Sequence, residues 1–116
     1  MKLRFRKNSL RLRVNQQEAA LLAAGEELAE HIAFAGGATL SYVLVSLPNA
    51  PATAEFDGKV IRITAPLEEW ALAADIGYYF EVEPRLKIAI EKDLECVDGP
   101  EEEKDPLAFP RLANVC

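Results

Sequence analysis

The sequence has few of the residue types on which enzymes most often depend. Its 116 residues include one histidine, His31, and two cysteines, Cys96 and Cys116. A Ser-His-Asp or Cys-His site would have to use His31, which lies in no recognised nucleophile motif. The cysteines form no C-x-x-C pair, which excludes a zinc ribbon and a thioredoxin-type redox site. We therefore predict no catalytic residue, no metal site and no cofactor.

Glycines and carboxylates add no ligand-binding motif. The glycines at positions 25, 36, 37, 58, 77 and 99 fit neither G-x-G-x-x-G nor G-x-x-x-x-G-K-[ST], the loops that cradle phosphates. The carboxylates of Asp93, Glu95 and Asp98 have no spacing specific to Mg²⁺, and a solvated acidic face is far commoner. These patterns exclude the common nucleotide-binding loops.

A long apolar segment is also missing. The longest uncharged stretch, residues 31–54, is broken by Gly36, Gly37, Pro48 and Pro51 into a hairpin-like piece and a loop. Near the N-terminus, charges interrupt the region where a signal peptide would be apolar. We expect no membrane segment and a cytoplasmic protein with reduced cysteines.

Positive charge is scarce overall but concentrated at one end. The net charge of -6 and the pI near 4.8 disfavour nucleic acid as a partner. Yet residues 2–13 hold six of the thirteen Lys and Arg residues and no acid. This contrast is the main functional question that the sequence raises.

The first residues alternate as β-strands do, with a change of phase. Leu3 and Phe5 are odd-numbered, whereas Leu10 and Leu12 are even-numbered, so one uninterrupted strand would place the two pairs on opposite faces. A two-residue turn at Lys7-Asn8 restores the phase by placing Phe5 opposite Leu10 and Leu3 opposite Leu12. A bulge at this point would also restore it. Both alternatives predict strands with one apolar and one basic face.

The rest of the chain alternates hairpins with two short helices. Residues 26–35 suit either a strand or a helix, and we favour a strand. The other expected elements are a helix over 16–24 that ends at Gly25, a strand over 39–46, a hairpin that turns at Asp57-Gly58, a helix that opens at 64–70 and ends near Gly77 with Trp70 and Leu72 facing the sheet, and strands over 78–83 and 85–97.

The order ββ-α-ββ-ββ-α-ββ predicts an α+β fold with a mainly antiparallel sheet of about six to eight strands. Residues 1–97 are expected to form one domain, followed by an acidic, proline-containing tail over 98–116 in which Leu107 and Phe109 are candidates for contact with the body. No internal repeat is evident in the sequence.

Two sources of negative charge could balance the basic N-terminal strands. In the predicted hairpin Arg4 faces Arg11, and like charges directly opposite are unfavourable. Residues 91–105 carry eight acids and two lysines, a net charge of -6 that matches the +6 of residues 1–14. A first strand beside the last strand would therefore neutralise the basic residues internally. The alternative is an external anion, because arginine forks bind phosphate bidentately.

Two stretches resemble a family of small uncharacterised bacterial proteins. They are K-L-R-F-R-K-N-S-L-R-L-R at 2–13, followed by a short helix, and E-K-D-L-E-C-V at 91–97, followed by an acidic run and A-F-P at 108–110. The order of these landmarks extends over nearly the whole chain. The resemblance implies a bacterial cytosolic protein and carries over no catalytic residue.

From the sequence we expect a noncatalytic domain that binds a partner protein or forms a homodimer through a sheet edge. The alternative is an anion-binding protein, a class that includes enzymes acting on a phosphorylated small molecule. Its ligand would bind at the N-terminal arginines Arg4, Arg6, Arg11 and Arg13.

Overall fold

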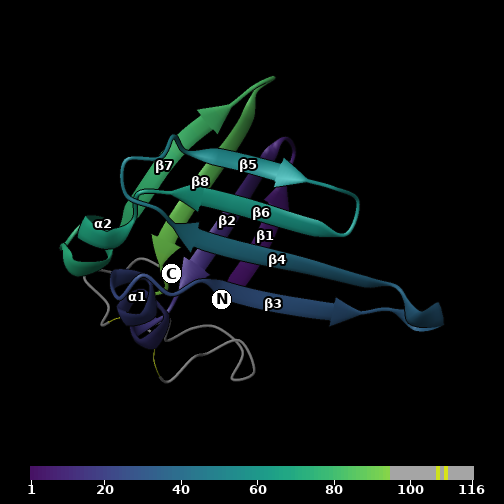
Figure 1. Ribbon diagram of the computed structural model, residues 1–116, viewed down its shortest axis with the longest axis horizontal. Coiled ribbons are helices and arrows are strands. Elements are labelled where there is room, and N and C mark those ends of the chain that lie inside the picture. Colours follow the sequence, from purple (N-terminus) through teal and green to yellow (C-terminus); the bar gives the residue numbers. More distant parts are fainter. Residues whose placement is uncertain (95–106, 108, 110–116) are drawn as a thin grey trace.

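The computed structural model describes residues 1–94, Leu107 and Phe109, and these residues build two β-sheets and two helices (Figure 1). A 3₁₀ turn over Ala35–Gly37 joins the third strand to the fourth. In chain order, the elements are β1 (Lys2–Arg6), β2 (Ser9–Val14), α1 (Gln16–Ala23), β3 (Leu28–Ala33), β4 (Thr39–Ser46), β5 (Thr53–Phe56), β6 (Val60–Ala65), α2 (Glu68–Leu72), β7 (Gly77–Val82) and β8 (Leu86–Lys92).

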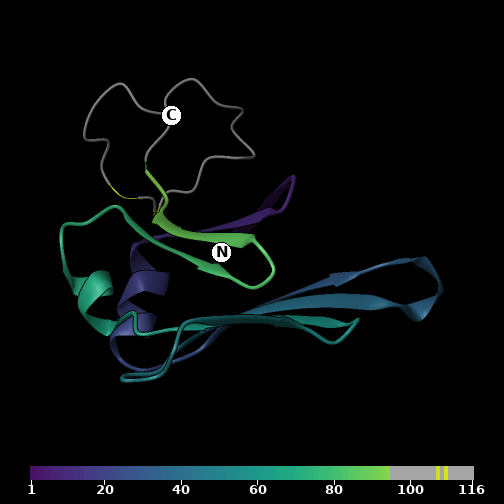
Figure 2. The ribbon, with the colours of Figure 1, turned by 90° about the horizontal axis from the view of Figure 1, so that it is seen from above.

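The strands form two layers, with both helices together at one end (Figure 2). Sheet A has the order β1-β2-β8-β7, and sheet B has the order β3-β4-β6-β5. Each sheet has one central parallel pair, β2–β8 or β4–β6, between antiparallel hairpins. The predicted α+β class and element order are confirmed. The strands are divided between two sheets, which the local pattern did not reveal.

The two halves of the chain have the same topology. If β1, β2, β3 and β4 exchange places with β5, β6, β7 and β8 respectively, the strand order of sheet A becomes that of sheet B. Leu12 of β2 pairs with Ile90 of β8, and the corresponding pair in sheet B is Ile63 with Leu44. β2 and β6 also share one burial pattern, in which every second residue is buried. The two halves of the chain are thus related by a pseudo-two-fold axis.

The N-terminal hairpin has the predicted register. Phe5 lies opposite Leu10 and Leu3 lies opposite Leu12, with Lys7-Asn8 as the turn. Lys7 takes a φ of 52°, the positive value that a tight hairpin turn requires. The change of phase in the sequence therefore reflects a hairpin and not a bulge.

The β5–β6 hairpin turns one residue later than predicted. Phe56 pairs with Ile61, so that Gly58 and Lys59 are the two turn residues. Gly58 supplies a φ of 96°, and the Asp57 carboxylate accepts a 2.8 Å bond from the Lys59 N–H. This register matches apolar partners across the pair, whereas a turn at Asp57-Gly58 would have paired Phe56 with Lys59.

Helix α1 begins with a capping box formed by Asn15 and Glu18. The Asn15 side chain accepts a 2.9 Å bond from the Glu18 N–H, and the Glu18 carboxylate accepts a 3.0 Å bond from the Asn15 N–H. In the described part of the chain, no helix is long and apolar enough to cross a membrane.

Helix α2 is shorter than predicted, and fewer of its side chains face the core than predicted. Trp70 is buried, but Leu72 is 78% exposed and does not face the sheet. Two residues along a helix rotate a side chain by about 200°, so Leu72 points away from the side on which Trp70 packs. The helix ends at Leu72, before the predicted limit near Gly77.

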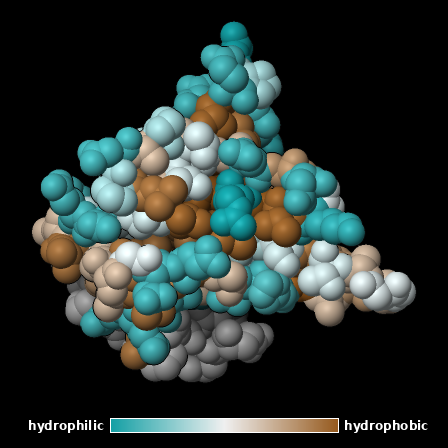
Figure 3. Space-filling view, in the orientation of Figure 1, coloured by the Kyte–Doolittle hydropathy of each residue, from teal (hydrophilic) through white to brown (hydrophobic). Residues whose placement is uncertain are grey.

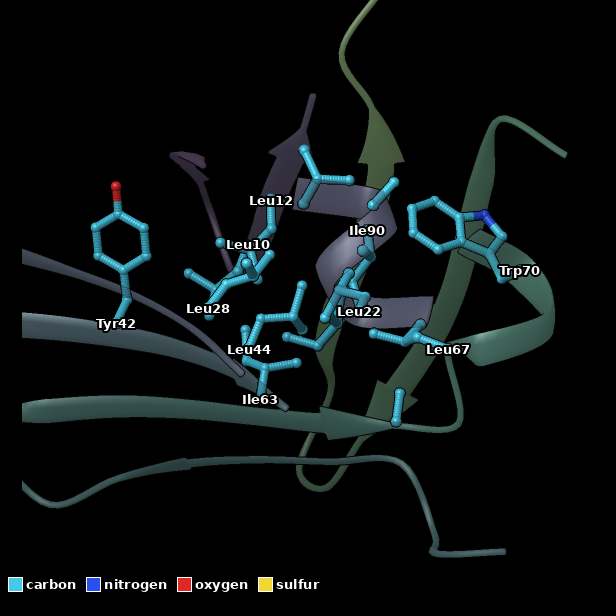
Figure 4. Packing of buried hydrophobic residues seen from close by; sticks show 14 of the residues in the cluster. Leu10, Leu12, Leu22, Leu28, Tyr42, Leu44, Ile63, Leu67, Trp70 and Ile90 are labelled. Atoms are coloured by element: carbon cyan, nitrogen blue, oxygen red, sulfur yellow. The ribbon is translucent and has the colours of Figure 1, made fainter. Parts of the chain in front are cut away.

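The core lies between the two sheets and is closed at one end by the helices (Figure 4). Burying one such aliphatic side chain contributes roughly 1.5–3 kcal/mol. The most completely buried side chains come from both sheets and both helical segments: Leu12, Leu22, Leu44, Ile63, Leu67, Ile88, Ile90 and Val14.

Two residues of the predicted C-terminal tail belong to the described structure. Phe109 donates its backbone N–H to the Asp93 carbonyl at 2.6 Å, and the Gln16 N–H bonds to the Leu107 carbonyl at 2.9 Å. Phe109 also packs against the core. The expected contact of these two residues with the body is present, whereas the rest of the predicted tail, over 98–116, lies outside the described residues.

Candidate functional site

Six basic side chains lie on the outer face of sheet A. Because strand side chains alternate, the burial of Leu10 and Leu12 leaves Arg11 and Arg13 on the opposite face of β2. The registers of β1 and β8 with β2 bring the neighbouring basic residues to the same face. We call this set the basic face: Lys2, Arg4, Arg6, Arg11, Arg13 and Lys87.

The basic face is ordered in three rows across the sheet. From β1 to β7 the rows are Lys2-Arg13-Glu91-Gly77, then Arg4-Arg11-Ala89-Tyr79, then Arg6-Ser9-Lys87-Glu81. Small side chains therefore stand within the second and third rows: Ala89 lies between Arg11 and Tyr79, and Ser9 lies between Arg6 and Lys87.

Glu91 holds the two arginines of β2. Its Oε1 lies 3.1 Å from Arg11 Nε and 3.7 Å from Arg13 Nε, and its side chain is only 15% exposed. This contact follows from the parallel pairing of β2 with β8, which places Arg13 directly opposite Glu91. Since Arg11 is bound through Nε, its two terminal nitrogens remain available for another acceptor.

A second internal pair closes the same end of the basic face. Lys2 Nζ donates to Asp93 Oδ2 at 2.6 Å, and the Asp93 side chain is 8% exposed. The neutralisation expected from residues 91–105 is thus present for Glu91 and Asp93, while residues 95–105 lie outside the described chain. β8 lies between β2 and β7, so the first strand, β1, is not beside it as expected.

Tyr79 fixes the other oxygen of Glu91. Its hydroxyl donates to Glu91 Oε2 at 2.8 Å, and this bond to a carboxylate raises the pKa of Tyr79 above its usual value, with partial burial as the next cause. A Cβ placed on Gly77 would lie 2.2 Å from the Tyr79 hydroxyl oxygen. The tyrosine ring therefore lies across Gly77, and Glu91 is oriented from both sides.

A hollow of about 520 Å³ opens over the second and third rows. Ser9 and Ala89, with their small side chains, form part of its floor. Its rim carries four cations, one carboxylate and one aromatic ring, from Arg4, Arg6, Arg11, Lys87, Glu81 and Tyr79.

Positive charge in the hollow is only partly balanced. Arg4 pairs directly with Arg11 across the β1–β2 hairpin, an arrangement that is unfavourable without an anion. Within residues 1–94, Leu107 and Phe109, neither Arg4 nor Arg6 is in an ion pair. The hollow is therefore a site at which an added anion would relieve repulsion.

The structure brings three of the four predicted arginines together. Arg4, Arg6 and Arg11 reach the hollow, whereas Arg13 does not line it and contacts Glu91 instead. Sequence reasoning missed Lys87. Its signal was present, because Lys87 has the same strand parity as Glu91 and so had to share its face.

A further cation lies on the opposite face of sheet A, inside the core. Lys92 is 5% exposed, its Nζ donates to the Ala73 carbonyl at 2.5 Å, and it lies 5.1 Å from the Trp70 ring centroid. It also lies 5.7 Å from the Phe109 ring. Burial lowers the pKa of Lys92 from its usual 10.5. Lys92 thus joins β8, α2 and the C-terminal segment and takes no part in the hollow.

Metal binding has no equivalent support, since no group of three or more His, Cys, Asp or Glu side chains is gathered in the part of the chain that the structure describes.

No curated protein and no solved structure matches the chain. A family model does match it, over residues 1–111, which include both the β1–β2 hairpin and β8. The chain therefore belongs to DUF7009, a family of unknown function.

Proposed function

We propose that the basic face binds an anion with phosphate-like or sulfate-like oxygens in the hollow of sheet A. The observation that carries the proposal is the convergence of Arg4, Arg6, Arg11 and Lys87 on one hollow, where Glu81 is the one rim carboxylate among the described residues. Arginine presents its donors as a planar fork that matches the oxygens of phosphate or sulfate.

The backbone sets a spacing that suits one oxyanion between two arginines. Arg4 and Arg11 are directly paired across antiparallel strands, which places their Cα atoms about 4.5–5.5 Å apart. Arg6 follows Arg4 on the same face, about 6.6 Å along the strand. Three guanidinium groups can therefore approach one anionic group from two sides.

Internal acids leave this part of the basic face unsatisfied. Glu91 accepts from Arg11 through Nε and does not reach Arg4 or Arg6 by any contact within the described residues. The Tyr79 hydroxyl holds Glu91 in place. The network therefore orients Arg11 and leaves its terminal nitrogens for a ligand.

The dimensions favour a small molecule over a polymer. Small-molecule sites commonly have volumes of about 300–1,000 Å³, a range that includes the hollow of about 520 Å³. A net charge of -6 would repel a long polyanion beyond the basic face. The ligand class that fits is a compact anion carrying one or two phosphate or sulfate groups.

The test is a thermal-shift and calorimetric titration with phosphate, pyrophosphate, sulfate and nucleoside monophosphates at low salt. A ligand at 100 times its Kd stabilises the folded state by about 2.7 kcal/mol, which is a measurable rise in melting temperature. We expect at least one anion to bind, with affinity falling as ionic strength rises.

The variant Arg4→Gln/Arg6→Gln should lose this binding while keeping its fold. The matched control is Arg62→Gln, because Arg62 occupies the position in sheet B that Arg11 occupies in sheet A. If no anion shifts the melting temperature of the wild type, or if the double variant binds as tightly as the control, the proposal is wrong.

A further inference from the structure

Four strands lie at sheet edges, and three of them are guarded by charge. On its solvent side β1 carries Arg4 and Arg6, β5 carries Glu55, and β7 carries Glu81. Such charges discourage pairing with another chain. The fourth edge, β3, has no lysine, no arginine and no proline.

The charged residue of β3, Glu30, is in an ion pair. Glu30 Oε1 lies 3.1 Å from the ammonium group of Met1. Beyond it, Ile32 is 42% exposed and Phe34, just after the strand, is 55% exposed. The β3–β4 hairpin extends past sheet A as a free arm (Figures 1 and 2). In Figure 3 this arm protrudes at the right, with few hydrophilic side chains.

The hydrogen-bond pattern shows which backbone groups face the open edge. The Phe34 N–H bonds to the Ala38 carbonyl at 2.8 Å, in register with the β3–β4 pairs. Hydrogen-bonded pairs alternate along an antiparallel ladder, so Ile32 and Glu30 also bond to β4. The N–H and C=O groups of the intervening residues, Ala29, His31 and Ala33, consequently point away from β4.

The edge-facing residues follow the order Ala-His-Ala, which is the same in both chain directions. Ala29 and Ala33 are small and stand symmetrically on either side of His31. An antiparallel partner related by a two-fold axis at His31 would place Ala29 opposite Ala33 of the second copy, and His31 opposite its own counterpart. A two-fold interface must be self-complementary in this way.

We propose that two copies of this chain associate through antiparallel pairing of their β3 strands, with the two-fold axis at His31. The two four-stranded B sheets then form one continuous sheet. Ile32 packs over the stem of Glu30 of the second copy, and Phe34 packs beside its Leu28. The ammonium of each Met1, which also contacts Glu18, stays ion-paired with the Glu30 of its own copy.

The arrangement predicts a reversible dimer rather than an obligate one. A single strand pair with a few apolar contacts buries less than the roughly 1,200–2,000 Å² of a standard stable interface. The association is independent of the hollow, which lies on sheet A. Anion binding and dimerisation are therefore expected to be separable by mutation.

Disulfide trapping tests the register directly. In a Cys96→Ser/Cys116→Ser background, His31→Cys should cross-link to its counterpart under mild oxidation, because hydrogen-bonded antiparallel partners have Cα atoms about 5.5 Å apart, within disulfide range. Ala29→Cys is the matched control. In the proposed register Ala29 faces Ala33 of the second copy, and the two Ala29 residues are offset by four residues along the strands. Ala29→Cys alone should therefore not cross-link, whereas adding Ala33→Cys should allow it.

Light scattering across a concentration series tests the association in the native chain. The mass should rise from 12.8 kDa toward twice that value. His31→Pro should remain monomeric with its fold intact, because the N–H that it removes points away from β4 and edge strands tolerate proline there. Ala29→Lys/Ala33→Lys should have the same effect through charge.

Three outcomes would overturn the proposal. The first is a wild-type mass that stays monomeric at every concentration. The second is equal cross-linking of His31→Cys and Ala29→Cys. The third is a dimer that persists in both blocking variants, because that dimer would use another surface.

Discussion

The ring of Tyr79 lies across Gly77 so closely that a Cβ on the glycine would fall 2.3 Å from the carbon that bears the tyrosine hydroxyl. Glycine is weak in strands because it packs nothing. Here the aromatic ring covers the exposed backbone and directs its hydroxyl to Glu91. This pair of residues on β7 therefore determines how the acidic partner of Arg11 is held.

Gly77→Ala should displace the Tyr79 ring and break its bond to Glu91. The expected loss is about 0.5–1.5 kcal/mol of unfolding free energy, the usual contribution of one hydrogen bond. Urea denaturation measures it. Tyr79→Phe should cost a similar amount, and the double variant little more than either single one, because both changes remove the same bond. Fully additive costs would contradict this coupling.

Alkaline pH should destabilise the folded protein by deprotonating the N-terminal amine of Met1. Burial opposes the charge of its ammonium group, but the bonds to Glu18 and Glu30 outweigh burial and raise its pKa above 8.0. Folding therefore favours the protonated amine. The resulting stability is complete below about pH 8 and is lost as the pH rises through the raised pKa of the folded state.

Unfolding free energies of wild type and Glu30→Gln, measured from pH 7 to pH 9.5, isolate this effect. The wild type should lose more stability than the variant over that range, because the variant lacks one of the two carboxylates on Met1. Taking the difference removes the titration of unrelated groups. Parallel curves would show that Glu30 does not raise the amine's pKa.

Removing a charge from the hollow should stabilise the unliganded protein. Arg4→Gln relieves repulsion with Arg11, which lies directly opposite, and should add about 0.2–1 kcal/mol at low ionic strength. The gain should vanish near 1 M salt, where the screening length is about 3 Å. Urea denaturation at both salt concentrations measures it, and a loss of stability at low salt would mean that Arg4 already has a neutralising partner.

The two faces of α2 should respond very differently to substitution. Trp70→Ala should cost about 3–5 kcal/mol, because it opens a cavity beside Lys92. Leu72→Glu should change stability by no more than about 0.5 kcal/mol, since the leucine is 78% exposed. Thermal denaturation of both variants tests this contrast, and equal losses would show that Leu72 is buried in solution.

Local pattern predicted the strands well because each hairpin leaves a signal within a few residues. The change of phase between Phe5 and Leu10 predicted either a hairpin or a bulge, and the hairpin alternative has the observed register, including the Arg4–Arg11 pair. The β5–β6 turn was placed one residue early, because Asp57-Gly58 is a strong turn signal by itself. There the apolar pairing of Phe56 with Ile61 decided the register.

Long-range pairing was the part that sequence could not supply. Nothing local indicates that β2 lies beside β8 while β4 lies beside β6, so neither the two sheets nor the hollow was foreseen. Lys92 is the clearest single case. Its parity with Ile90 places the side chain on the inner face, whereas its charge disfavours burial, and only long-range contacts with the Trp70 ring and the Ala73 carbonyl resolve this conflict.

The interleaving of the halves has a consequence for how the fold can be divided. Each sheet takes one hairpin from residues 1–46 and one from residues 53–92, and the central parallel pairs join the two. Neither fragment alone has a strand to set against its own β2 or β6. Cut between Leu47 and Ala52, each piece should be unfolded in isolation, and the two pieces should regain structure only when they are mixed.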